Sequence, residues 1–480
     1  MPLTIAFDNS YAALPDRFYT RQAPVPVASA ELLLLNHGLA AELGLDADEL
    51  QSPEGLAMLA GNSAPEEAAP LAQVYAGHQF GNWVPRLGDG RALLLGEVVS
   101  PTGQRMDIQL KGSGQTPYSR MGDGRAWLGP VLREYIVSEA MHALGVPTTR
   151  GLAAVATGET VLREAPFPGA VLTRVAPSHI RVGTFQYFAS QGDRDGLQTL
   201  TEHVMARHYP AAEDALHLLQ QVVAAQARLV AQWMGFGFIH GVMNTDNAHV
   251  AGITIDYGPC AFMDRFDPGK VFSSIDRMGR YAYARQPDMA VWNMAQLATA
   301  LLPLIDADQD AAIAKATEAV HSFPKIYNAA WQEVHGAKLG LATVQEGDDT
   351  LIHDLLLLMH EGQADFTNTF RTLAEGGPTR DQVTNRATFD DWHARWQTRL
   401  KQEPGSDSAK QDRMQQANPA LIPRNHRIEE AITQALSGNL EPSYRLIAAL
   451  SAPFASDRQY DDLRTPPSES EEVRQTFCGT

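Results

Sequence analysis

Two side chains with hard oxygen atoms, Asn247 and Asp256, lie nine residues apart and could hold a metal ion together. Asn247 ends the stretch HGVMNTDN, which begins at His240, and Asp256 follows a short apolar run and precedes Tyr257 and Gly258. Amide and carboxylate oxygens suit Mg²⁺, which binds proteins through one or two side chains together with phosphate oxygens and water. An Asp-x-Gly sequence by itself is more typical of a simple turn. The two motifs at this spacing favour a metal site.

The stretch HGVMNTDN has the spacing of the catalytic loop of protein kinases, H-R-D-x-x-x-x-N. In that loop the asparagine holds a metal ion, and the aspartate two places after the histidine receives the proton of the substrate hydroxyl. Here Asn247 keeps its place, but the aspartate position is occupied by Val242. The sequence therefore predicts a kinase-like metal site without the kinase base.

Lys111 ends a predicted strand, residues 105–111, whose side chains alternate between polar and apolar. A lysine on such a polar face is usually solvated. Its spacing changes this interpretation, because Lys111 lies 21 residues after Gly90 and 23 residues before Glu134, close to the glycine loop, lysine and helix glutamate of kinases. We expect Glu134 to pair with Lys111 and to orient it toward phosphate. Glu139, on the same predicted helix, remains the alternative partner.

The pentapeptide GDGRA occurs twice, at residues 88–92 and 122–126. Glycines let backbone N–H groups approach an anion, and an adjacent arginine can make paired hydrogen bonds to phosphate. Neither copy completes G-x-G-x-x-G, and each could be only a hairpin turn. Two copies flanking a strand lysine favour a phosphate cradle, whose candidate residues are Gly88, Gly90, Arg91, Asp123 and Gly124.

Arg174 and Arg181 lie in the stretch LTRVAPSHIRVGTFQYF, which follows the last predicted strand of this part of the chain. Arginines in such positions are usually surface residues. These two fall near the junction between the strand-rich and the helical parts, where an anionic ligand would reach them.

The elements that must position these residues indicate an α+β fold with two unlike lobes and a cleft between them. A helical pattern covers residues 28–45, and strands are predicted at 91–99, 105–111, 151–164 and 169–175. A helix is expected at 127–144, and a long amphipathic helix at 215–235 leads into HGVMNTDN. We divide the chain into an N-terminal extension (1–75), a smaller β-rich lobe (76–185), a helical lobe with the catalytic loop (186–330) and a helical C-terminal extension with a tail (331–480).

Composition limits the partners. The 480 residues carry a formal charge of −18, from 38 basic and 56 acidic residues, which argues against binding to nucleic acid or to an anionic membrane. The sequence shows neither a signal peptide nor an apolar run of the ~20 residues that a membrane helix needs, so we expect a cytoplasmic protein. Two cysteines, Cys260 and Cys478, exclude a disulfide framework. The polar segment 463–480 is predicted to be an exposed tail.

Together these motifs resemble the YdiU/selenoprotein O family. The resemblance runs from about Gly88 to the last residue. It is carried by LGDGRA, LKGSGQTPYSRMGDGRA, REYIVSEAMHALGVPTTR, HGVMNTDN with IDYGP, NPALIPRNH and TFCGT. It implies a protein-kinase-like fold and the transfer of AMP, rather than phosphate, from ATP to Ser, Thr or Tyr hydroxyls of other proteins. The nucleotide would be reversed relative to kinases, with its α-phosphate facing the acceptor.

The resemblance also implies roles for individual residues. Asp246 would be the proton acceptor, Asn247 and Asp256 would hold Mg²⁺, and some members use UTP with Mn²⁺. ATP would be bound by Gly88, Gly90, Arg91, Lys111, Asp123, Gly124, Arg174, Arg181 and Asp256. Cys478 matches a cysteine or selenocysteine of the family and is a candidate redox residue. Serines stand in KVFSSID where some relatives have a cysteine, so a regulatory disulfide would have to involve Cys260.

Two other functions remain open at this point. One is an atypical kinase that transfers the γ-phosphate with Asp246 as its base, and the other is a noncatalytic nucleotide- or redox-sensing scaffold. Of the three functions, AMP transfer is the one that we expect. We also expect the protein to be a monomer. The sequence does not identify the acceptor proteins.

Overall fold

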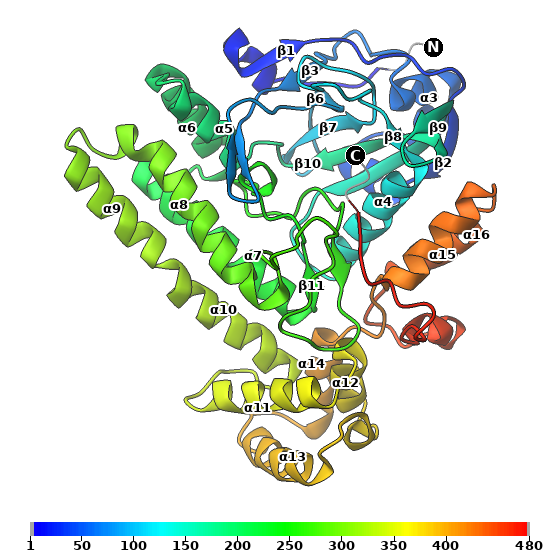
Figure 1. Cartoon of the computed structure of the whole chain (residues 1–480), viewed down its shortest axis with the longest axis vertical. Coiled ribbons are helices and arrows are strands. Elements are labelled where there is room, and N and C mark those ends of the chain that lie inside the picture. The colour runs from blue at the N-terminus through cyan, green and yellow to red at the C-terminus, as the bar shows by residue number, and fades with distance from the viewer. Residues whose placement is uncertain (1–3, 478–480) are drawn as a thin grey trace.

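The computed structural model describes residues 4–477, in which a large sheet lies beside a mainly helical region (Figure 1). The strands of the sheet are β1 (Tyr19–Arg21), β2 (Glu31–Leu35), β3 (Leu71–Gln73), β6 (Ala92–Val99), β7 (Arg105–Lys111), β8 (Ala126–Trp127), β9 (Arg150–Leu162) and β10 (Pro166–Ala176). Their order is β1-β3-β6-β7-β10-β9-β2, with β8 paired to β10. These pairings are antiparallel, so the fold is α+β.

Two short ribbons lie outside this sheet. They are β4 (Gly77–Gln79) with β5 (Asn82–Val84), and β11 (Phe238–Ile239) with β12 (Ala261–Phe262). The second ribbon brackets the segment that contains the stretch HGVMNTDN and Asp256. A strand pair therefore fixes both ends of the segment that carries the predicted metal ligands.

Sixteen α-helices are described within residues 4–477. They are α1 (His37–Leu43), α2 (Ala47–Gln51), α3 (Pro53–Ala60), α4 (Leu128–Ala143), α5 (Val182–Ser190), α6 (Arg194–His208), α7 (Ala215–Gly235), α8 (Gln286–Ile305), α9 (Gln309–His321), α10 (Phe323–Lys338), α11 (Asp348–Glu361), α12 (Phe366–Ala374), α13 (Arg386–Leu400), α14 (Asp407–Ala417), α15 (Asn425–Leu436) and α16 (Glu441–Leu450). Helix α4 packs on β9 and β10, and α15 and α16 pack on α4 (Figure 1). The sheet and the helices share one continuous hydrophobic core, and a second cluster joins α1–α3 to the sheet.

Strands and helices with a strong local pattern form where the sequence predicts them. The two hairpins β6–β7 and β9–β10 match the predicted strands, and α4 and α7 match the predicted helices. In the turn between β6 and β7, Gly103 has φ +82°, a conformation that glycine adopts at low cost.

The polar face of β7 is buried, although its alternation resembles that of a solvated strand. Asp107 and Gln109 are 1% and 0% exposed. The Asp107 carboxylate accepts a hydrogen bond from Arg207 and lies 2.9 Å from Nδ1 of His179. Because a buried carboxylate needs partners, residues from the segment after β10 must fold over this face of the sheet.

Residues 28–45 are not the single helix that their pattern predicts. Strand β2 occupies Glu31–Leu35 and α1 begins at His37, with Asn36 between them. The Asn36 side chain caps α1 by accepting a hydrogen bond from the Leu39 N–H, and β2 pairs with β9 at the edge of the sheet. Pairing with a distant strand outweighs the helical propensity of the leucine run.

The prediction of an exposed tail is wrong for Thr476. This residue is 2% exposed, forms a parallel bridge with Ser273, and donates a hydrogen bond from Oγ1 to the Pro259 carbonyl at 2.6 Å. The end of the described chain therefore reaches the segment that follows Asp256. Cys478, the candidate redox residue, lies outside the described residues, so its redox role stays a prediction and the question of a disulfide with Cys260 stays open.

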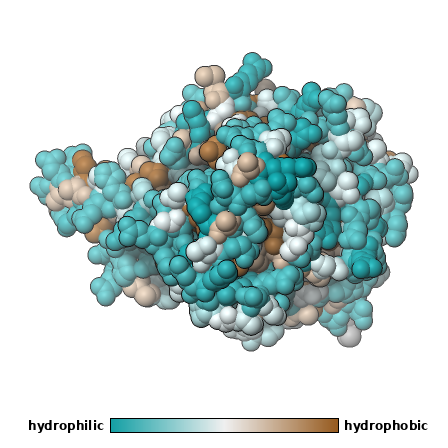
Figure 2. All heavy atoms as spheres, turned by 90° about the horizontal axis from the view of Figure 1, so that it is seen from below, coloured by the Kyte–Doolittle hydropathy of each residue, from teal (hydrophilic) through white to brown (hydrophobic). Residues whose placement is uncertain are grey.

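The surface seen in Figure 2, which views the molecule from the end formed by α11 and α13, is mainly hydrophilic, with hydrophobic residues in small scattered groups. None of the helices within residues 4–477 is long and apolar enough to cross a membrane.

Candidate active site

A pocket of about 770 Å³ lies between the sheet and the segment that carries Asn247 and Asp256. This volume is in the range of small-molecule sites. With Cys478 outside the described residues, the pocket is lined by each of the other predicted site residues, namely Gly88, Gly90, Arg91, Lys111, Asp123, Gly124, Glu134, Arg174, Arg181, Asp246, Asn247 and Asp256. Residues that are far apart in the sequence thus converge on one cavity.

Lys111 projects from the end of β7 and pairs with Glu134 of α4. Its Nζ also lies 2.9 Å from Oδ1 of Asp256. Glu139, five residues further along α4, instead binds the Arg150 guanidinium at 2.8 Å and accepts a hydrogen bond from the Gly151 N–H. The geometry therefore separates the two glutamates: Glu134 belongs to the pocket, and Glu139 ties α4 to β9.

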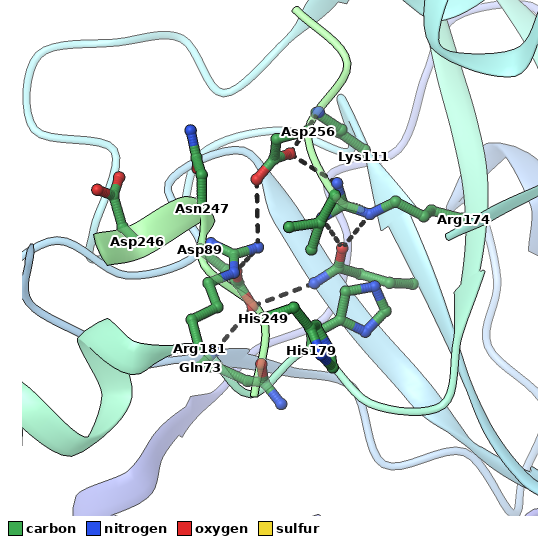
Figure 3. A network of polar contacts seen from close by, with 12 residues as sticks. Gln73, Asp89, Lys111, Arg174, His179, Arg181, Asp246, Asn247, His249 and Asp256 are labelled. Carbon is green, nitrogen blue, oxygen red and sulfur yellow. Dashed lines mark hydrogen bonds and ion pairs between the residues drawn. The ribbon is translucent and has the colours of Figure 1, made fainter. Parts of the chain in front are cut away.

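Asp256 is surrounded by cations, as Figure 3 shows. Besides Lys111, Arg174 Nη1 lies 2.7 Å from its Oδ1, and Arg181 Nη2 lies 3.7 Å from its Oδ2. Burial opposes the charge of this carboxylate, but the three cations outweigh burial and hold the pKa of Asp256 well below its ordinary value. Asp256 is therefore ionised and ready to act as a ligand at neutral pH.

The two arginines are held in place by residues that the sequence did not single out. Arg174 donates to Oε1 of Gln109 from Nε and Nη2, at 3.1 and 2.6 Å. Arg181 lies over the Tyr75 ring, 4.5 Å from its centroid, and its Nη2 is 4.0 Å from Oδ1 of Asp89. A guanidinium fixed in this way loses little freedom when it meets an anion.

Asp89, within the first GDGRA copy, is a buried carboxylate that accepts hydrogen bonds from the Gln73 N–H and the Gln109 side chain. Burial raises the pKa of Asp89 to about 6, although Arg181 and the Gln73 N–H oppose this shift. Its place behind Arg181 indicates that it orients this arginine.

The stretch HGVMNTDN forms a short loop in which each polar side chain has a distinct partner. The His240 ring contacts the Ile255 carbonyl at 2.9 Å, directly before Asp256. Nδ2 of Asn247 donates to the Val242 carbonyl at 2.9 Å, which leaves its Oδ1 as an available oxygen. His240 therefore positions the backbone at Asp256, and Val242 contributes a carbonyl where a kinase has its base.

Asp246 lies beside Asn247 in a 3₁₀ turn, Thr245–Asn247. Its Oδ2 accepts a hydrogen bond from Gln79 at 2.9 Å, and its Oδ1 is buried with no hydrogen-bond partner among the described residues. Burial raises the pKa of Asp246 to about 6, partly offset by the Gln79 hydrogen bond.

The two GDGRA copies differ in what their side chains do. Gly88 has φ +113°, and a Cβ there would lie 2.4 Å from the Tyr118 ring, so only glycine fits. In the second copy Asp123 is paired with Arg163 at 2.8 Å, and Arg125 donates to the Val25 carbonyl. The second copy is thus fixed to its own surroundings, although both copies line the pocket.

The pocket is positively charged in an acidic chain. Among its described lining residues are seven Lys or Arg and five Asp or Glu side chains, against a formal charge of −18 for all 480 residues. A local excess of cations favours a polyphosphate ligand.

Comparison with known proteins agrees with this chemistry. Residues 2–451 match the family model described as "Protein adenylyltransferase SelO". Proteins named "Protein nucleotidyltransferase YdiU" from Jannaschia sp. (strain CCS1) and Ruegeria sp. (strain TM1040) are each 59% identical, and one from Ruegeria pomeroyi is 57% identical. Each comparison covers 100% of both chains. The chain belongs to the SelO/YdiU family. It is an enzyme of the nucleotidyltransferase class and acts on a nucleotide.

The pocket of this SelO/YdiU family member also contains residues that spacing did not reveal. They are Tyr75, Gln79 and Asp89, which lie between β3 and β6. The signal that could have found them is local: the stretch VYAGHQFGNWVPRLGDG combines glycines with aromatic and polar residues directly before the first GDGRA arginine.

Proposed function

We propose that this enzyme transfers AMP from ATP to Ser, Thr or Tyr hydroxyls of other proteins, and that its fold is a kinase-like arrangement of two lobes. Residues 76–185 would form the smaller lobe and 186–330 the catalytic-loop lobe, with extensions at 1–75 and 331–480. A strand lysine paired with a helix glutamate beside a metal-binding aspartate supports the kinase-like arrangement. Family membership supports nucleotidyl transfer.

The observation that carries AMP transfer is the replacement of the kinase base. Val242 is buried and apolar, 4% exposed, and cannot take a proton. The carboxylate that lines the pocket from this loop is Asp246, four residues later. A proton acceptor in a new place implies that the acceptor hydroxyl also lies in a new place. This supports attack on the α-phosphate of ATP, whereas a kinase directs the hydroxyl to the γ-phosphate.

The donor set fits Mg²⁺ or Mn²⁺. Asn247 Oδ1 is left available by the hydrogen bond of its Nδ2, and Asp256 is kept ionised by its cationic neighbours. Within residues 4–477 no cluster of three or more His, Cys, Asp or Glu could hold a metal alone, which suits an ion that takes its remaining ligands from phosphate and water. When bound, the ion supplies a Lewis acid at the phosphates.

The side chains of this pocket suit pyrophosphate as a leaving group. Lys111, Arg174 and Arg181 would bind and neutralise the β- and γ-phosphates. The acceptor oxygen forms a bond to the α-phosphorus, the bond from this phosphorus to the bridging oxygen of the β-phosphate breaks, and pyrophosphate leaves with that electron pair. The hydroxyl proton passes to Asp246.

Transfer from two labelled forms of ATP tests the proposal. With Mg²⁺ and a hydroxyl-bearing protein acceptor, or the enzyme itself as acceptor, label in the α-phosphate should appear on protein while label in the γ-phosphate should not. The reverse result would indicate a kinase, and no transfer of either label would indicate a scaffold. The same assay with α-labelled UTP and Mn²⁺ tests whether UMP is also transferred.

A further inference from the structure

The β4–β5 hairpin, residues 77–84, lies directly on the loop that carries Asp246. Three hydrogen bonds join them: the His78 N–H donates to Thr245 Oγ1 at 2.7 Å, the Phe80 N–H to Asn244 Oδ1 at 2.9 Å, and Gln79 Nε2 to Asp246 Oδ2 at 2.9 Å. Two of these bonds use the hairpin backbone and depend little on its side chains. The third is specific to the amide of Gln79.

The hairpin approaches Asp246 so closely that a side chain at position 77 would press against the carboxylate. A Cβ at Gly77 would lie 3.0 Å from Asp246 Oδ1 and 3.1 Å from Asp246 Cβ. The turn that aims Gln79 at the carboxylate has Phe80 at φ +51° and Gly81 at φ +83°. A non-glycine residue in this conformation costs energy and persists where the surroundings demand it.

The carboxylate of Asp246 is therefore enclosed but not saturated. Gln79 fills one acceptor position on Oδ2, and Oδ1 accepts no hydrogen bond from the described residues. An ionised carboxylate has about four acceptor positions, so the acceptor hydroxyl can bind while the Gln79 contact persists. A single fixed donor selects one rotamer of the aspartate, and the other acceptor positions of the carboxylate have no donor among the described residues.

We propose that Gln79 is a positioning residue that holds the Asp246 carboxylate in the orientation required to take the proton of the acceptor hydroxyl. The inference rests on the proposed function, since it assumes that Asp246 is the proton acceptor. Gln79 takes no part in bond making: the hydroxyl oxygen bonds to the α-phosphorus, its proton goes to Asp246, and pyrophosphate departs. The β4–β5 hairpin is then the wall of the acceptor site opposite the nucleotide phosphates.

A purely structural role for Gln79 makes different predictions. If the amide only tied the hairpin down, its loss would loosen the pocket, weaken ATP binding and act independently of Asp246. If it orients Asp246, its loss should lower kcat at saturating ATP, leave the KM for ATP nearly unchanged, and have no further effect once the carboxylate is gone.

The test uses steady-state transfer of α-label by the full chain with Mg²⁺, ATP and a protein acceptor. For Gln79→Met, which keeps the side-chain length without the donor, we expect kcat to fall about 10-fold or more, with the KM for ATP changed less than about 2-fold. Gln79→Glu, which places a second carboxylate against Asp246, should be at least as damaging. Asn82→Ala, on the exposed strand of the same hairpin, is the matched control and should behave like the wild type.

A double-mutant cycle completes the test. In an Asp246→Ala background, Gln79→Met should change kcat by less than about 2-fold. Wild-type kcat in Gln79→Met, or a full additional loss in the double variant, overturns the positioning role while leaving the proposed function intact. Failure of the wild type to transfer α-label overturns both. Fluorescence-monitored binding of Mg·ATP to each variant confirms that the pocket is formed.

Discussion

Asp256 and Asp246 line the same pocket, ten residues apart in the chain, and have opposite surroundings. Asp256 meets Lys111, Arg174 and Arg181. Asp246 accepts a hydrogen bond from one neutral amide, that of Gln79, and its turn packs against both β4 and α5. The pKa of the first is held well below its usual value by cations, and burial raises the pKa of the second to about 6. Two identical side chains thus differ in proton affinity, as the proposed roles of metal ligand and proton acceptor require.

The largest effect should come from the cation-surrounded carboxylate. Asp256→Asn keeps the size of the side chain but removes the charge that faces three cations and would face the proposed metal ion. We expect α-label transfer to fall on the order of 10³-fold or more, because several kcal/mol of transition-state stabilisation depends on the bound metal. Asp267→Asn removes a carboxylate eleven residues further along the chain, outside the pocket, and is the control. Retention of a tenth of the activity would contradict a role as metal ligand.

The enclosed carboxylate should show a different kinetic signature. For Asp246→Asn we expect kcat to fall about 10²-fold or more, since a general base contributes at least that factor, while the KM for ATP stays within about 3-fold of wild type. Asp256→Asn should instead alter both parameters. Equal effects of the two variants on the KM for ATP would remove the distinction between ligand and proton acceptor.

The two glutamates of α4 offer a similar comparison with a smaller expected effect, because Glu134 lies in the pocket and Glu139 ties α4 to β9. Glu134→Gln should lower kcat/KM for ATP about 10-fold, because Lys111 loses the partner that orients it. Glu139→Gln should leave kcat/KM within about 3-fold but lower the stability to urea by about 1–3 kcal/mol, because the buried Arg150 loses a hydrogen-bonding partner. A loss of kcat/KM in Glu139→Gln, with no loss in Glu134→Gln, would show that the ion pair between Glu134 and Lys111 does not serve the activity.

Burial favours the neutral form of Lys338, as it favours the neutral form of Asp246. The lysine therefore offers a second test of what burial without a counter-ion does to a charge. Within residues 4–477 no carboxylate lies in ion-pair distance of its Nζ, which lies 4.3 Å from the centroid of the Phe370 ring, and burial lowers its pKa to about 7. Between pH 7 and about 10 the unfolded chain keeps the lysine proton while the folded chain loses it, so stability should rise with pH by on the order of a few kcal/mol.

Urea unfolding of the wild type and of Lys338→Met between pH 6 and 10 measures this effect. The substitution should flatten the rise in stability and leave transfer of α-label unchanged, because Lys338 lies outside the pocket. An identical pH dependence in both proteins would assign the rise to other groups.

Local patterns were sufficient for the parts of the fold with strong periodicity. The hairpin strands β6, β7, β9 and β10 and helices α4 and α7 follow from alternation, helical period and the turns that bound them. The spacing of Lys111 from Glu134 also reflects a strand and a helix of usual length, so part of the pocket lining, including this pair, could be named in advance. Their roles stay predictions.

What the sequence did not reveal depends on contacts between distant residues. Gln79 and Asp246 are 167 positions apart, and Arg207 and Asp107 are 100 apart. Neither pair has a spacing signature, since the fold alone brings its members together. The same reason explains β2, which forms in a helical pattern because β9 offers an edge, and Thr476, which is buried by Ser273 and Pro259.

The backbone of Asp256 has φ +64°, a left-handed conformation that among residues other than glycine is adopted mainly by Asn and Asp. The proposed metal ion and the turn therefore place two separate constraints on this position. A descendant that had lost catalysis would be released from the first but not from the second. Asn or Gly at this position would then mark a former enzyme, whereas a β-branched residue would indicate that the turn itself had changed.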